Sequence, residues 1–380
     1  MITKRCVLAV ASLAVAAMLA ACATQKAPSN PNEIVIGLAG PMTGDLAVFG
    51  EQQRRGAEAA VEEINAKGGV LGKKLRLVQA DDQCKPALAV DAADRLVRQG
   101  AVFVSGHFCS GSSIPASAVY AAANVLQITP SSTNNALTDD AAAKGVTTIL
   151  RVCNRDDQQG AFAGAWIAKT YAGKKVAVID DTSPYGKGLA DVAAANMEKG
   201  GLQPVIRTTY QHNDQDFAAL IDTLIVAKID VVYAGGYHDD EARILRQARS
   251  KGLKADWISG DALNTSEFGA IAGSASDGVR FSDAAAATGL RSAREAVEKL
   301  RGAGYEPEGY TLNAYATIQV FAAAATATGS TDGKAMAAWL RKSIVPTVVG
   351  DLSWDAKGDV TKPRFAWFVW QNGQFSQAPE

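Results

Sequence analysis

The sequence predicts an α/β protein built from two lobes, each with a central parallel sheet covered by helices. From residue 34 onward, short apolar runs rich in β-branched residues alternate with Ala-rich segments that carry apolar residues at helical spacing. A polar passage at 154–160 interrupts this alternation, and the pattern restarts at residue 175. The chain has 380 residues and is 48% hydrophobic, which is enough for two separate cores. Because strands alternate with helices, the sheets should be parallel.

The first block of the chain is predicted to hold five strands, each an apolar run bounded by glycine, proline or polar residues. Between the first two, Ala57, Val61 and Ile64 recur at helical spacing, and the glycines at 68–69 end that helix. The expected strands are 34–39, 74–80, 102–105, 125–129 and 148–152, and the expected helices are 49–67, 88–99 and an Ala-rich segment after Pro115.

The second block repeats this plan, and the last third of the chain returns to the first lobe. In the helix at 217–227, Leu220, Ile221 and Leu224 are spaced to face a core. Strands are expected at 175–180, 204–209, 229–234, 255–259 and 279–282, and the other helices at 189–199 and 241–251. The last third adds helices at 293–303, 310–328 and 334–342, then strand-like residues at 352–354, 358–359 and 364–370.

These blocks divide the chain into two lobes. We expect an N-terminal lobe formed by 33–153 plus 285–344 and a C-terminal lobe formed by 154–284 plus 345–377. The polar passage at 154–160 is interpreted as the first crossing between them. A ligand site between the two lobes is then the default expectation.

The first 22 residues have the pattern of an export signal. Lys4 and Arg5 precede an apolar stretch at 7–18, which is short for a membrane span, and small residues lead to Cys22. The run Leu-Ala-Ala-Cys resembles the bacterial lipobox, which implies that Cys22 carries a lipid after cleavage. Simple cleavage before a spare cysteine is the alternative. Residues 23–32 are expected to form a flexible tether.

Three cysteines lie beyond the signal. Export to an oxidising compartment allows a disulfide, and we favour the pair Cys84 and Cys109. Closing that loop would stabilise the fold by roughly 3–3.5 kcal/mol and would hold the Cys84 loop beside Ser110. Cys153 is expected to be a buried free thiol. The cysteine spacing does not suggest zinc, and we expect neither a metal nor a cofactor.

Composition and motifs exclude several classes of function. Lysine plus arginine total 38 and aspartate plus glutamate 39, so the chain lacks the basic surplus of a nucleic-acid-binding protein. The sequence contains no His-Glu-x-x-His, Gly-x-Ser-x-Gly or Gly-x-Gly-x-x-Gly motif, and only three histidines. One of them, His107, is interpreted as a packed histidine. We therefore expect a protein that is not an enzyme.

Two hydroxyl-rich loops follow predicted strands. The run 101–106 leads into Ser110, Ser112 and Ser113 at the start of a helix, and 125–129 leads into 130–134. A helix start offers free N–H groups and a positive dipole end, which suit an anion such as a carboxylate. Loops at the carboxyl ends of neighbouring strands can converge on one ligand. Simple helix capping is the alternative for either loop alone.

Several passages in order along the chain carry a resemblance to a known family. The chain resembles the leucine/isoleucine/valine-type periplasmic binding proteins, the solute receptors of ABC amino-acid importers. That resemblance implies two Rossmann-like lobes, three hinge crossings, a ligand held by lobe closure, and the Cys84–Cys109 disulfide. The matching passages are Asn-Ala-Lys-Gly-Gly (65–69), Asp-Asp-Gln-Cys (81–84), Gly-His-Phe-Cys-Ser (106–110), Thr-Pro-Ser-Ser-Thr-Asn (129–134), Tyr-Gly-Lys-Gly-Leu (185–189), Gly-Gly-Tyr (235–237), Leu-Arg-Gln-Ala-Arg-Ser-Lys-Gly (245–252) and Trp-Asp-Ala-Lys-Gly-Asp (354–359).

The resemblance also implies roles for particular residues. Ser110 and Thr133, with the backbone at Ser131, would hold the α-carboxylate of an amino acid, and Asp261 would hold its ammonium. The remaining candidates are aromatic or lie on the opposing lobe: Phe49 would cover the ligand side chain, Tyr237 comes from the Gly-Gly-Tyr passage, and Tyr185 and Asp156 would lie at the rim and crossing.

Three departures from the family pattern bear on the ligand, and one is that serines replace smaller residues in the loop at 129–133. Asp261 stands where these receptors commonly carry Glu, and Phe49 stands where Trp or Tyr is frequent. The expected protein is a monomeric periplasmic receptor that delivers a branched-chain amino acid to membrane permease subunits. Two alternatives stay open: a sensory receptor of the same fold, and a receptor for an amide or another small polar ligand.

Overall fold

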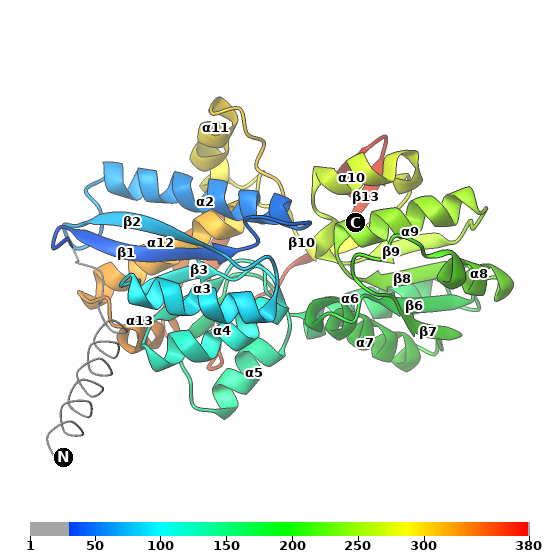
Figure 1. Cartoon of the computed structure of the whole chain (residues 1–380), viewed down its shortest axis with the longest axis horizontal. Helices are drawn as coiled ribbons and strands as arrows, with labels where there is room; N and C mark the ends of the chain where they lie inside the picture. Colours follow the sequence, from blue (N-terminus) through cyan, green and yellow to red (C-terminus); the bar gives the residue numbers. More distant parts are fainter. Residues whose placement is uncertain (1–29, 379–380) are drawn as a thin grey trace, which may run out of the picture.

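The computed structural model describes residues 30–378, which form two α/β lobes side by side (Figure 1). The first lobe has a five-stranded sheet in the order β2-β1-β3-β4-β5, and the second has a seven-stranded sheet in the order β14-β13-β10-β9-β8-β6-β7. The expected signal at 1–22, the lipid site at Cys22 and most of the tether at 23–32 lie outside the described residues.

The first sheet is entirely parallel, as the alternation of strands and helices predicts. Its strands are β1 Glu33–Gly40, β2 Lys74–Asp81, β3 Phe103–Gly106, β4 Leu126–Thr129 and β5 Ile149–Arg151. Its helices are α2 Ala47–Ala66, α3 Pro86–Arg98, α4 Ser110–Ala122, α5 Ala136–Ala143, α11 Arg294–Gly302, α12 Thr311–Thr328 and α13 Gly333–Leu340.

The second sheet is mixed rather than entirely parallel. Strands β6 to β10 run parallel, but β13 pairs antiparallel with β10 and β14 antiparallel with β13, because a short turn joins the last two strands. The strands are β6 Val176–Asp180, β7 Ile206–Thr209, β8 Val231–Gly235, β9 Asp256–Ser259, β10 Arg280–Ala284, β13 Phe365–Gln371 and β14 Gln374–Gln377. The helices are α6 Asp156–Thr170, α7 Pro184–Lys199, α8 Ala218–Val226, α9 His238–Ser250 and α10 Ser266–Ala272.

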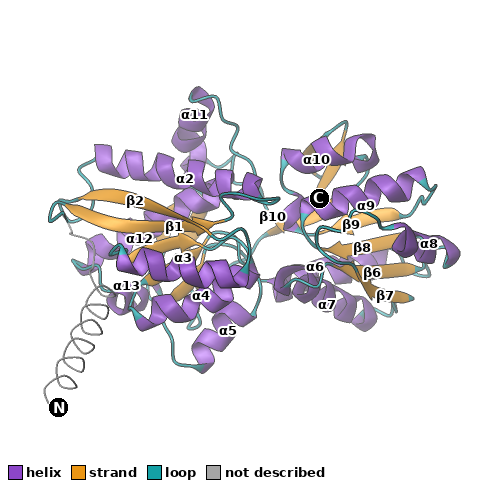
Figure 2. Ribbon diagram, in the orientation of Figure 1, coloured by secondary structure: helices purple, strands orange, loops and turns teal. Residues whose placement is uncertain are grey.

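Helices cover both faces of each sheet (Figure 2). In the first lobe, α2, α11, α12 and α13 share a core with one face, and α3 and α4 share a core with the other. In the second lobe, residues of β6 alternate between two cores: Ala177 and Ile179 pack with α8 and α9, whereas Val176 and Val178 pack with α6 and α7. This alternation follows from the two-residue period of a strand buried on both faces.

The chain crosses between the lobes three times, at 152–155, 285–290 and 361–364. The predicted boundary after residue 344 is wrong. Residues 345–360, which include the hairpin of β11 Val345–Thr347 and β12 Gly350–Leu352, pack into the first core through Val345 and Trp354. The Trp354 Nε1 donates to the Arg151 carbonyl at 2.7 Å, so this segment covers the exposed edge strand β5.

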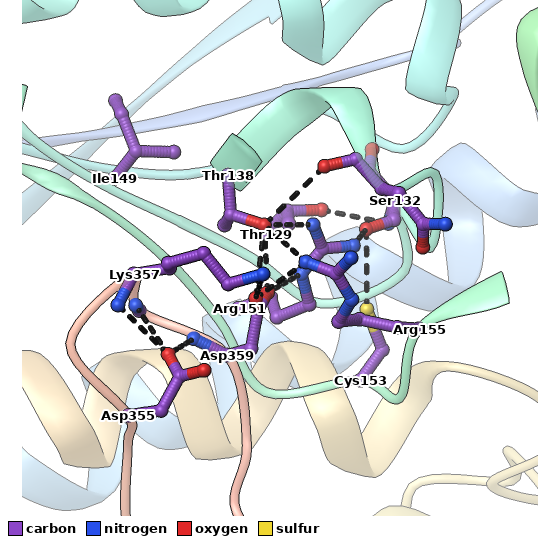
Figure 3. A network of polar contacts seen from close by, with 12 residues as sticks. Thr129, Ser132, Thr138, Ile149, Arg151, Cys153, Arg155, Asp355, Lys357 and Asp359 are labelled. Atoms are coloured by element: carbon purple, nitrogen blue, oxygen red, sulfur yellow. Dashed lines mark hydrogen bonds and ion pairs between the residues drawn. The ribbon is translucent and has the colours of Figure 1, made fainter. Parts of the chain in front are cut away.

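A buried ion network fixes this segment to the first crossing (Figure 3). Asp359 contacts the Arg151 Nε at 2.7 Å and the Arg155 Nη1 at 2.6 Å, and all three side chains are nearly inaccessible to solvent. Arg155 also pairs with Asp139, which lowers the pKa of that carboxyl to about 2. The network therefore joins the segment that precedes the third crossing to the two arginines of the first crossing.

Several helices begin earlier than the sequence pattern predicts. Helix α3 starts at Pro86 rather than at the expected 88. Helix α7 starts at Pro184, where a loop was expected, because Ser183 caps it by accepting from the Gly186 N–H. Helix α6 was not predicted, and it makes most of the expected crossing at 154–160 helical. The short helices α5 and α10 were not predicted either.

Candidate functional site

The first lobe contributes hydroxyl groups at the ends of two neighbouring strands. Ser110 begins α4 directly after the loop that follows β3, where the first N–H groups of a helix lack intrahelical acceptors. Its Oγ accepts from the Asn134 N–H at 3.2 Å. Ser131 follows β4, and its Oγ donates to the Phe108 carbonyl at 3.1 Å. Both serines are buried and line one cavity between the lobes.

A disulfide and a histidine hold the Ser110 loop. Cys84 and Cys109 are joined, 25 residues apart, and Cys109 immediately precedes Ser110. His107 is fully buried and packed, with its Nδ1 against Asp82 and its Nε2 2.9 Å from the Tyr120 hydroxyl. Both ring nitrogens of His107 are therefore occupied by protein partners, and the residue has a structural role. Cys153 is a buried free thiol whose pKa burial raises to about 12.

The second lobe contributes a buried carboxylate, Asp261, directly after β9. One of its oxygens accepts from the Tyr185 hydroxyl at 2.9 Å and from the Gln159 amide at 3.1 Å. The other oxygen accepts from the hydroxyl of Tyr310, which comes from the first lobe. Burial raises the pKa of Asp261, and the two tyrosine hydroxyls oppose that shift by favouring the charged form.

Aromatic rings form the apolar part of the cavity wall. Tyr185 and Tyr237 come from the second lobe, with ring centroids 5.3 Å apart, and Phe108 and Tyr310 come from the first, with centroids 5.0 Å apart. Phe49 does not line the cavity. It lies fully buried behind Phe108, with the two rings stacked at 4.3 Å, so Phe108 takes the covering position expected for Phe49.

Thr133 and Asp156 also lie outside the cavity lining. They meet at the first crossing, where the Asp156 N–H donates to the Thr133 carbonyl at 3.0 Å. Both side chains are buried, and within residues 30–378 the Thr133 hydroxyl and both Asp156 oxygens find no hydrogen-bond partner. Burial raises the pKa of Asp156 to about 8. These two residues therefore belong to the lobe contact.

The structure thus gathers five of the eight expected site residues around one cavity. It adds three that the sequence argument missed. Two of the added residues could have been identified from the sequence. Tyr310 directly precedes an apolar helix, and Phe108 lies inside the matched Gly-His-Phe-Cys-Ser passage. The cavity measures about 10 Å³, room for about one water, so a larger ligand fits only when the lobes separate. The gathered residues are Ser110, Ser131, Tyr185, Tyr237 and Asp261, and the added ones are Phe108, Ala262 and Tyr310.

The cavity has opposite chemistry at its two sides. Serine hydroxyls and a helix start on one lobe suit an anionic group, and a buried carboxylate on the other suits a cationic one. Near its rim, His212, Asp239 and Asp240 bring possible metal-ligand atoms within 4.8 Å of one another. The Arg243 guanidinium contacts both carboxylates and supplies the positive charge there, so we assign no metal to this cluster.

Two lobes connected by three crossings, with a polar cavity between them, define a solute-binding receptor of the periplasmic type. A family model described as periplasmic binding protein matches residues 33–374, and the chain belongs to this family. The family consists of periplasmic solute receptors, not enzymes. Among the described residues, no helix has both the length and the apolar character needed to cross a membrane.

Relatives of known name support the same class. The chain is 43% identical to an amino acid binding protein of Pseudomonas aeruginosa, over 91% of this chain and 93% of that protein. It is 40% identical to the Leu/Ile/Val-binding protein homolog 2 of Brucella abortus, over 90% and 91% of the two chains.

Solved structures share the fold. A leucine binding protein from Thermotoga maritima superimposes with a TM-score of 0.84 at 27% identity, covering 91% of this chain and 98% of that one. A branched-chain amino acid transporter substrate binding protein from Streptococcus pneumoniae, in complex with isoleucine, gives 0.82 at 26% identity, covering 90% and 97%.

Proposed function

We propose that this protein is the receptor of an ABC importer that binds a branched-chain amino acid between its lobes. The observation that carries the proposal is the buried Asp261, which lines the same cavity as Ser110 and Ser131 of the opposite lobe. An α-amino acid carries an ammonium and a carboxylate on the same carbon. Its two charges therefore match the carboxylate on one side of the cavity and the hydroxyl groups on the other. The relatives named for leucine, isoleucine and valine binding favour an aliphatic side chain.

The proposed roles follow from hydrogen-bonding capacity. The Ser110 hydroxyl donates to the ligand carboxylate, the Ser131 hydroxyl turns from the Phe108 carbonyl to the same carboxylate, and Asp261 accepts from the ammonium. Charge-assisted bonds of this kind contribute roughly 1.5–3 kcal/mol each in a closed site. Tyr237 and Phe108 enclose the aliphatic side chain. Thr133 and Asp156 act at the lobe contact, and Phe49 supports Phe108 from behind.

The partners and location extend this proposal. The receptor acts in the periplasm as a monomer, anchored by a lipid on Cys22 after removal of residues 1–21, and delivers its ligand to membrane permease subunits. Lobe closure lets the permease distinguish the loaded receptor from the empty one, because the two lobes have a fixed relative orientation only in the closed form.

Calorimetric titration tests this proposal. Leucine, isoleucine and valine should bind the parent protein, whereas leucinamide and isopentylamine, which lack the carboxylate, should bind at least about tenfold more weakly. Asp261→Asn should weaken leucine binding by roughly 100-fold or more, because the ammonium is left without its counter-charge. Asp214→Asn, an exposed site in the same lobe, should leave binding unchanged. Equal affinity of the parent and Asp261→Asn would refute the ammonium assignment.

A further inference from the structure

A second and larger cavity lies at the second crossing between the lobes. It measures about 500 Å³, within the range of small-molecule sites and far larger than the cavity at Asp261. The crossing at 284–288 forms one wall, residues 306–313 of the first lobe form another, and the hairpin of β13 and β14 forms the third. We refer to this cavity as the hinge pocket.

The hinge pocket is acidic. Asp283, Glu306 and Glu308 line it, and among residues 30–378 its lining includes no lysine, arginine or histidine. Glu306 is paired with Arg301 at 2.6 Å, but neither of the other two carboxylates forms an ion pair within that part of the chain. Two carboxylates therefore face this space without a protein cation, which favours a positively charged ligand.

The two free carboxylates are held in place by the protein. The Glu308 oxygens accept from the Ser266 N–H at 2.9 Å and the Ser266 hydroxyl at 3.1 Å. Asp283 accepts from the Asn264 amide and from the Ala284 N–H. Burial, followed by the nearby charge of Asp261, raises the pKa of Asp283 to about 8. A ligand cation would favour the ionised form of Asp283 and relieve this cost.

The opposite wall of the hinge pocket is aromatic. Phe368, Trp370 and Phe375 line it, with ring centroids 5.0 Å apart for Trp370 and Phe375 and 6.2 Å apart for Phe368 and Phe375. Trp370 is fully buried, and within the described chain its Nε1 donor finds no acceptor. Aromatic faces attract organic cations and pack against apolar ligand bodies.

We propose that the hinge pocket is a second ligand site, which binds a small organic cation: a primary amine on an apolar or aromatic body. The ammonium contacts Asp283 and Glu308, and the body packs against Phe375, which Trp370 supports from the core side. This site is separate from the amino-acid cleft. Tyr310 contributes to the walls of both cavities and divides them.

Calorimetric titration of the whole mature protein with 2-phenylethylamine tests the proposal. Saturable binding is expected, with 2-phenylethanol and phenylacetate, which share the ring but lack the cation, at least about tenfold weaker. Asp283→Asn should weaken amine binding at least about tenfold, because it removes a charge partner. Asp261→Asn should not weaken amine binding, because that carboxylate belongs to the other cavity and the loss of its charge makes ionisation of Asp283 easier.

A second variant keeps the test decisive if Asp283→Asn fails to fold. Ala286 is an exposed residue of the hinge-pocket lining, so Ala286→Trp fills the cavity without disturbing a core. It should abolish amine binding and leave the circular dichroism spectrum of the folded protein unchanged. The proposal is overturned by absence of saturable amine binding, by equal binding of phenylacetate, by full binding in Ala286→Trp, or by loss of binding in Asp261→Asn.

Discussion

At the scale of residues, the cleft depends on how one carboxylate is solvated after burial. Asp261 is removed from water but accepts hydrogen bonds from Tyr185, Gln159 and Tyr310. These donors replace lost hydration and keep the charged form accessible. Tyr310 reaches Asp261 from the other lobe, so the same bond also connects the two lobes.

The Tyr310 hydroxyl should therefore stabilise the closed fold more than an ordinary surface hydroxyl. Tyr310→Phe should lower the free energy of unfolding by about 1.5–3 kcal/mol, as expected for a hydrogen bond to a charged group. Tyr305→Phe removes a half-buried hydroxyl whose partner is the neutral Thr311, and should cost about 0.5–1.5 kcal/mol. Urea denaturation measures both. Equal losses of unfolding free energy would show that the bond from Tyr310 to Asp261 stabilises the fold no more than a bond between neutral groups.

Asp156 gives the protein a distinctive pH dependence. Its pKa lies near 8 in the folded protein against an ordinary 3.8, so between these values the folded state holds a proton that the unfolded state lacks. Stability from this group is present below pH 3.8 and is lost as the pH rises towards 8. Asp156→Asn removes this loss. The free energy of unfolding of the variant, relative to that of the parent, should therefore rise by up to about 1.4 kcal/mol per pH unit in that window.

Urea denaturation at several pH values measures this difference. Asp214→Asn serves as the control, because Asp214 is exposed and should show a flat difference from the parent. A flat difference for Asp156→Asn as well would mean that Asp156 is ionised in the folded protein.

The sequence identified the polar residues of the site better than the aromatic ones. Ser110 lies in a matched passage after β3, and Asp261 follows β9, the strand after the Gly-Gly-Tyr helix, so the chain path fixes both positions. The choice between Phe49 and Phe108 depends on which ring packs in front, and only the packed structure decides that. The contact between Tyr310 and Asp261 joins residues of different lobes, so local sequence carries no sign of it.

At the scale of elements, the network around Asp359 connects the end of β5, the start of α6 and the segment before β13 (Figure 3). Asp359→Asn would leave Arg151 and Arg155 buried without one of their counter-charges. The expected cost is about 3–5 kcal/mol of unfolding free energy, as for other broken buried ion pairs. Thermal and urea denaturation measure it.

A matched control for this element is Asp351→Asn in β12, where the side chain is exposed. That variant should stay within about 0.5 kcal/mol of the parent. A cost for Asp359→Asn no larger than that of the control would mean that the network does not brace the crossing.

Strands were easier to place from sequence than helix starts. Strand β6 was expected at 175–180 and spans Val176–Asp180, because an apolar run between polar residues marks its ends. Helix α7 starts five residues before the expected 189, because its first turns contain Pro184 and two glycines, which lack an apolar periodicity. The Ser183-Pro184 pair is typical of a helix start, so the beginning of α7 could have been predicted from it.

At the scale of the molecule, two independent cores make relative lobe motion the means of binding. Each lobe has helices on both faces of its own sheet, and the lobes are joined by the three crossings, by the cleft contacts and by the bonds from Ser266 to Glu308. The two-lobe plan was predictable because the strand–helix pattern restarts at residue 175. The boundary at 344 was misplaced because 345–360 resembles the strands that follow it, although it packs on β5.

The central claim is that a zwitterion is held at opposite ends by opposite lobes. A crystal structure of the mature protein grown with leucine tests it most directly. The expected result is leucine between the lobes, with its carboxylate within hydrogen-bond distance of Ser110 and Ser131 and its ammonium within that distance of Asp261. Leucine bound with its ammonium directed at Ser110, or bound outside the cleft, would contradict the account.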